Sequence, residues 1–96
     1  MYTVVLECNN VPAGEGEQAA IDITTEFREH RRWHRNATCT WTGSSLVLEV
    51  ENDFDDNGLA SLDEFSDSIA AYVATLFDGS ILIRSVTKLD PSQPYS

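Results

Sequence analysis

One short run of this chain is rich in side chains that offer hard oxygen donors. Residues 53–65 read Asp-Phe-Asp-Asp-Asn-Gly-Leu-Ala-Ser-Leu-Asp-Glu-Phe and contain five carboxylates and one carboxamide. Calcium takes roughly six to eight oxygen ligands, several of them charged, and Gly58 would let the backbone turn sharply around an ion. Without a cation the five carboxylates would repel one another. This run is therefore the first candidate for a binding site.

The spacing within this run resembles the calcium loop of the EF-hand family. Asp53, Asp55 and Asn57 fall at loop positions 1, 3 and 5, with Gly58 at position 6 and Glu64 at position 12. The resemblance covers residues 53–65 only, and no family is recognised from the chain as a whole. It implies one structural calcium ion and a set of six ligand residues: Asp53, Asp55, Asn57, Leu59 through its backbone carbonyl, Ser61 directly or through water, and Glu64 through both carboxylate oxygens.

Three features depart from the family pattern. Position 8 holds Ala60 in place of a branched apolar residue, Asp56 adds a charge outside the ligand set, and a strand rather than a helix is expected to enter the loop. The chain has no second hand, so the paired architecture and the sensor behaviour of the family do not carry over. A lone loop implies weak affinity, with a dissociation constant on the order of 10⁻⁵ to 10⁻³ M.

The same residues also support an interpretation without a metal. Ser61-Leu62-Asp63-Glu64 has the pattern of a capping box, in which Ser61 caps a helix and Glu64 reaches back to the cap. Acidic residues in a first helical turn also interact favourably with the helix dipole. The loop is thus predicted to be either a calcium site or the start of a helix.

Positive charge is concentrated in residues 28–35, which hold four of the six basic residues, whereas eight of the sixteen acids lie between residues 49 and 67. Such segregation could steer a partner or pair one subunit with the next, although cations are also usual at a helix C-terminus. His30, His34 and Cys39 could supply zinc ligands, but a helix is expected to end between the two histidines, which disfavours that site.

Composition and spacing indicate a protein that is not an enzyme. No Ser-His-Asp or Cys-His arrangement is suggested, and Cys8 and Cys39 lie in probable strands as small buried groups. The net charge of −10 argues against nucleic acid and anionic membranes as ligands. No signal peptide or membrane-spanning run is evident, so we expect a cytoplasmic protein.

Hydrophobic periodicity predicts four strands and two helices. Trp33 and Trp41 share their alternation with Ala37 and Cys39, which predicts both indoles on the covered face of a sheet. The expected elements are a strand over 2–8, a helix over 15–30, a strand from 33 to 42, a turn at 43–45, a strand over 46–51, a helix with an apolar stripe from Leu62 to Leu76 that Asp78-Gly79 ends, and a strand over 81–89.

This β-α-β-β-α-β order predicts an α+β fold, a ferredoxin-like sandwich with a four-stranded antiparallel sheet and two helices on one face. Residues 1–90 would form the single domain and residues 91–96 a disordered tail. The other face would be open and carry threonine, glutamate and some of Val5, Val47, Leu82 and Val86. Such a face would be an oligomer contact or merely hold singly exposed valines.

Three functions remain open from the sequence. The first is a small acidic binding module that holds one calcium ion. The second is an acidic interaction or inhibitor protein, antitoxin-like or immunity-like, that neutralises a basic partner. The third is an oligomeric domain that binds a small ligand on its open sheet face. The expected partners are therefore another protein or further copies of the chain, and fold alone cannot select among them.

Overall fold

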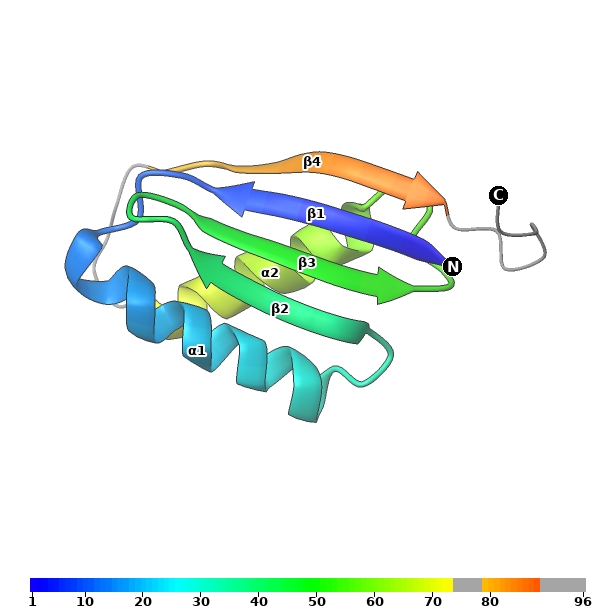
Figure 1. Cartoon of the computed structure of the whole chain (residues 1–96), viewed down its shortest axis with the longest axis horizontal. Helices are drawn as coiled ribbons and strands as arrows, with labels where there is room; N and C mark the ends of the chain where they lie inside the picture. The colour runs from blue at the N-terminus through cyan, green and yellow to red at the C-terminus, as the bar shows by residue number, and fades with distance from the viewer. Residues whose placement is uncertain (74–78, 89–96) are drawn as a thin grey trace, which may run out of the picture.

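The computed structural model describes residues 1–73 and 79–88 and shows an α+β fold (Figure 1). The predicted β-α-β-β-α-β order is confirmed. The elements are β1 (Tyr2–Cys8), α1 (Ala13–His30), β2 (Arg35–Trp41), β3 (Leu46–Asn52), α2 (Leu59–Tyr72) and β4 (Ile81–Lys88). The strand order is β2-β3-β1-β4 with every neighbouring pair antiparallel, which is compatible with a ferredoxin-like arrangement. The predicted tail over 91–96, and the expected helix residues 76 and 78, lie outside the described residues.

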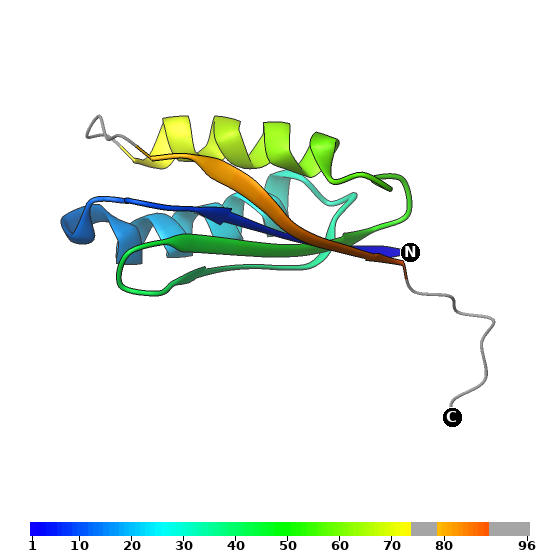
Figure 2. The ribbon, with the colours of Figure 1, turned by 90° about the horizontal axis from the view of Figure 1, so that it is seen from above.

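The core lies between one face of the sheet and the two helices. Alternation along β1 and β3 sends every second side chain to this face, as it does for Leu6 and Leu48, which are fully buried. Phe27 of α1 and Phe65 of α2 are equally inaccessible and are the largest fully buried side chains of the described residues. Figure 2 shows the sheet along its edge, with α2 on one side and no helix of the described chain on the other.

The predicted position of the two tryptophans is half right. Trp41 packs against the core from the end of β2, and Gly16 of α1 lies so close that a Cβ there would sit 2.3 Å from its ring. Trp33 was expected on the same face, but it precedes the strand and its side chain is 51% exposed. Asn36 has a φ of 51°, and the pairing of β2 with β3 shifts register there, so the alternation does not extend back to residue 33.

Helix α1 closes the outer edge of β2. Thr24 Oγ1 accepts a hydrogen bond from the Cys39 backbone N–H at 2.9 Å, and Arg28 Nε donates one to the Ala37 carbonyl at 2.8 Å. These side chains occupy backbone groups that a further strand would otherwise use. The middle of this sheet edge, at Ala37 and Cys39, is therefore hydrogen-bonded within the chain.

The open face of the sheet is mixed. Glu49 lies between Val5 of β1 and Thr38 of β2 in the pairing, and Val47 is only half-buried. Val86 was grouped with this face as one option, but it pairs with buried Val4 and packs against the core. No helix within the described residues is long and apolar enough to cross a membrane.

Candidate functional site

The acidic loop joins β3 to α2, and a buried asparagine begins it. Asn52, the last residue of β3, is 1% exposed. Its Oδ1 accepts hydrogen bonds from the backbone N–H groups of Phe54 at 3.2 Å and Asp55 at 2.8 Å. This short-range pattern turns the chain out of the sheet and fixes the start of the loop.

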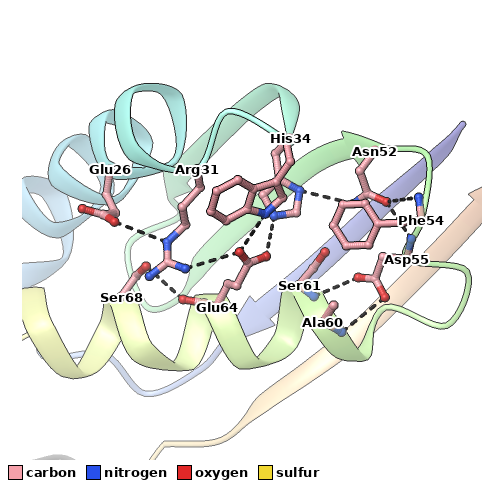
Figure 3. Close-up of polar contacts among 11 residues, drawn as sticks. Glu26, Arg31, His34, Asn52, Phe54, Asp55, Ala60, Ser61, Glu64 and Ser68 are labelled. Atoms are coloured by element: carbon pink, nitrogen blue, oxygen red, sulfur yellow. Dashed lines mark hydrogen bonds and ion pairs between the residues drawn. The ribbon is translucent and has the colours of Figure 1, made fainter.

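Asp55 caps helix α2. Its Oδ1 accepts from the Ala60 N–H at 3.2 Å and its Oδ2 from the Ser61 N–H at 2.8 Å, and the residue is 3% exposed (Figure 3). A carboxylate at this place satisfies two of the amides that a helix start leaves open and suits the helix dipole. Gly58, with a φ of 78°, provides the left-handed residue that lets the chain enter the helix at Leu59.

The predicted capping box is wrong. Ser61 is the third residue of α2 rather than its N-cap, and Gly58 occupies the cap position. Ser61 is fully buried, and its hydroxyl has no hydrogen-bond partner among residues 1–73 and 79–88. Glu64 does not reach back to the helix start, because its two oxygens bind side chains from another part of the chain.

Glu64 is the acceptor for three donors from the segment that connects α1 to β2. Its Oε1 accepts from Trp33 Nε1 at 2.8 Å and lies 3.3 Å from Arg31 Nη1, and its Oε2 lies 2.5 Å from His34 Nε2 (Figure 3). The Glu64 side chain is 16% exposed and that of His34 is fully buried. Arg31 also forms an ion pair with Glu26 at 3.3 Å. We call Arg31, Trp33, His34, Asn52 and Glu64 the His34 network.

The hydrogen bonds of Asn52 fix the tautomer of His34. Because Asn52 Oδ1 accepts two backbone N–H groups, its Nδ2 must be the atom that faces His34 Nδ1, at 3.2 Å. His34 Nδ1 is then an acceptor, so Nε2 carries the proton and donates it to Glu64. The network thus links the end of β3, the segment after α1 and the second turn of α2.

The six residues of the expected calcium set lie in three different environments. Asp53, Asn57 and Leu59 are exposed, Asp55 and Ser61 are buried, and Glu64 is partly buried. Both oxygens of Asp55 and both of Glu64 already accept hydrogen bonds or ion pairs, and Asn57 Oδ1 accepts from the Leu59 N–H at 3.0 Å. Within residues 1–73 and 79–88, no three carboxylate, histidine or cysteine side chains converge to hold a metal.

The donor set in this arrangement does not fit a calcium ion. Asp55 and Glu64 would have to leave their present partners before they could coordinate one. Calcium binding stays a prediction, which the titration proposed below tests. The three candidate zinc ligands do not come together in the described residues either, since His30 is exposed at the end of α1 whereas His34 and Cys39 are buried.

The two thiols are buried and free. Burial raises the pKa of Cys8 to about 11, and burial together with the charge of Cys8 raises the pKa of Cys39 to about 12. A thiol of this kind is a poor nucleophile near neutral pH, because the thiolate is the reactive form. The expectation that both cysteines are small buried groups is confirmed.

Four other carboxylates near the loop have no partner. The side chains of Asp53, Asp56, Asp63 and Asp67 are exposed and form no ion pair or hydrogen bond with the described residues. Beside them in the sequence, Phe54 is 47% and Leu59 54% exposed. We call these four acids and two apolar residues the acidic end.

A cavity of about 210 Å³ lies where the acidic loop meets the basic segment. Its lining carries charges of both signs, from Arg32 and Arg35 and from Asp53. Comparison with family models, with curated proteins and with solved structures found no match to this chain. The functional argument therefore depends on the geometry alone.

Sequence reasoning missed the partners of Glu64. His34 was considered as a possible zinc ligand, and Arg31 was noted only as part of a basic segment. Asn52 could have been found, because an Asn directly before an acidic turn often bonds to the backbone two or three residues on. The link from the segment after α1 to α2 spans 30 residues or more and carries no local signal.

Proposed function

We propose that this chain is a non-enzymatic binding module whose acidic end binds a basic protein partner. The observation that supports the proposal is the division of the acids into two groups. Asp55 and Glu64 stabilise the fold through hydrogen bonds and ion pairs. No such hydrogen bond or ion pair within the described residues involves the side chains of the other four acids, which face solvent: Asp53, Asp56, Asp63 and Asp67.

Unpaired carboxylates make the local electrostatic potential more negative and attract a cationic surface. Exposed Phe54 and Leu59 add apolar surface beside them, and an apolar or aromatic anchor next to charged side chains is typical of protein interfaces. A partner with lysine or arginine around an apolar contact would match this end. Neutralising such a partner is the inhibitor function that the charge of the chain suggests.

The calcium module is the alternative. In its favour is the match of the loop residues to the EF-hand spacing; against it is the engagement of Asp55 and Glu64 described above. The two functions differ in their response to cations, because a metal site that forms only in the folded state must raise the melting temperature by mass action.

The test is a titration followed by isothermal calorimetry with an oligolysine peptide as the probe, and separately with calcium. We expect saturable heat with the peptide that weakens with salt, and no saturable heat with millimolar calcium. Saturable calcium heat together with a higher melting temperature would replace this proposal by the calcium module.

A matched pair of variants tests where the peptide binds. Asp63→Asn with Asp67→Asn removes two charges from the acidic end, and Glu17→Gln with Glu29→Gln removes two exposed charges from α1. The first pair is expected to weaken binding more than the second. If both pairs weaken it equally, the peptide senses only the net charge and the proposed surface is wrong.

A further inference from the structure

The two edges of the sheet differ in the hydrogen bonding of their outward backbone groups. At the β2 edge, Thr24 and Arg28 of α1 hydrogen-bond to the outward backbone groups of Cys39 and Ala37. Strand β4 forms the other edge and pairs only with β1. Within residues 1–73 and 79–88, no hydrogen bond reaches its outer side. A row of unpaired N–H and C=O groups is a template for another strand.

The side chains of β4 are also more exposed than the core-facing side chains of β2. Its first three residues, Ile81, Leu82 and Ile83, are aliphatic and none is buried; Leu82 is 42% exposed. On β2, the core-facing residues Ala37 and Cys39 are 1% and 7% exposed. Leu82 thus leaves apolar surface uncovered on one face of β4, and Ile81 and Ile83, which pack against the core from the other face, stay partly exposed. A strand added here would cover both this apolar surface and the unpaired backbone groups.

The charge distribution indicates that the added strand comes from a second copy of this chain. The chain carries a net charge of −10, so two copies repel each other in most orientations. Strand β4 contains no acid, and it carries Arg84 and Lys88. Arg84 also lies 3.7 Å from Glu7 of its own chain, which offsets part of its charge. The β4 edge is therefore a place where two copies can approach with little repulsion.

The sequence of β4 is compatible with pairing to itself. In an antiparallel pair centred on Leu82, Ile81 faces Ile83 of the second copy and Arg84 faces its Ser80. Aliphatic residues then meet aliphatic residues, and no cation lies opposite a cation. The irregularity in the β1–β4 pairing falls after Ile83, so the segment that would pair is regular.

We propose that residues 80–84, at the start of β4, pair antiparallel with the same segment of a second copy, about a two-fold axis at Leu82, so that one sheet runs through both copies. The resulting contact is isologous, as in most homodimers. The inference does not depend on the proposed function, and the two are measured separately.

The test is sedimentation equilibrium of the wild type and two matched variants. Leu82→Lys adds a charge to an exposed aliphatic residue of β4, and Ile21→Lys makes the same change on α1, where Ile21 is 56% exposed. We expect a wild-type dimer, at least about tenfold weaker association for Leu82→Lys, and no change for Ile21→Lys. Circular dichroism of each variant checks that the fold is kept.

Two results would overturn the proposal. One is a wild-type monomer at all protein and salt concentrations. The other is a dimer that survives Leu82→Lys but dissociates with Val47→Lys, which would place the contact on the open face of the sheet. Amide hydrogen exchange provides an independent readout that does not need a variant. Exchange in β4 should slow as the protein concentration rises, and unchanged exchange there would contradict the pairing.

Discussion

Replacing Glu64 by glutamine tests whether the His34 network holds α2 against the segment after α1. The change keeps the size of the side chain and removes its charge. The carboxylate accepts from Trp33 and His34 and pairs with Arg31, all at 2.5 to 3.3 Å. A glutamine has one acceptor oxygen, so its NH₂ group must face at least one of these donors. His34 cannot adapt by moving its proton to Nδ1, because Asn52 Nδ2 donates there.

The size of the effect follows from burial. The Glu64 side chain is 16% exposed and that of His34 is fully buried, so solvent can replace few of the lost contacts. Breaking a buried charged pair costs about 3 to 5 kcal/mol, and the partial exposure of Glu64 and Arg31 reduces this to roughly 3 kcal/mol. For a domain of this size, 3 kcal/mol lowers the melting temperature by roughly 12 to 24 °C.

The assay is urea unfolding followed by circular dichroism, with Asp63→Asn as the control. Asp63 is the preceding residue on α2, is exposed and has no ion pair with the described residues, so its change is expected to stay within about 0.5 kcal/mol. A double-mutant cycle with Trp33→Phe isolates the indole hydrogen bond, and we expect a coupling above about 0.5 kcal/mol. Equal stability of Glu64→Gln and Asp63→Asn would refute the reasoning.

Three further predictions follow from the contacts. Asp55→Ala should lower the free energy of unfolding by about 1 to 2 kcal/mol because it removes the cap of α2, whereas Ser61→Ala should leave it nearly unchanged because the Ser61 hydroxyl has no partner among the described residues. If urea unfolding shows the larger loss for Ser61→Ala, Ser61 is the cap. Burial raises the pKa of Cys39 to about 12 from 9.0, so the folded state keeps a proton that the unfolded state loses, and the stability of the fold should fall as the pH rises from 9 towards 12. Alkylation of the thiol at pH 8 should be slow until the protein unfolds, and rapid labelling of the folded protein would contradict this. Gly16→Ala should destabilise by about 1 to 3 kcal/mol because a Cβ would strike the indole at the end of β2, whereas Gly14→Ala, with nothing within 4 Å, should not; equal thermal melts would contradict the close packing of α1.

The fold was predictable because local patterns and topology agree. The alternation of apolar and polar residues in β1 and β3 and the apolar stripes of the helices identify which face of the sheet is covered. The order of the elements leaves few possible arrangements of four strands. The error at Trp33 has a local cause. In the sequence, the alternation of residue types runs from 33 to 41. In the structure, Asn36 adopts a left-handed conformation that interrupts it, and the sequence alone does not show which Asn in a strand will do so.

The place of the site was predictable and the use of its residues was not. A dense acidic run between a strand and a helix indicates a special loop, and it does contain the cap of α2. That Asp55 rather than Ser61 provides the cap depends on how the chain turns at Gly58. That Glu64 binds His34 depends on packing α2 against the segment after α1, which only the tertiary structure brings together.

The central claim is that Asp55 and Glu64 serve the fold while the exposed acids beside them bind a basic partner. The most direct test is an NMR titration of the labelled protein with the oligolysine peptide and, separately, with calcium. We expect the peptide to shift the amide signals of Asp53, Asp56, Asp63 and Asp67 and to leave those of β2 unchanged, while calcium has no saturable effect. Saturable shifts with calcium centred on residues 53–64, and none with the peptide, would contradict it.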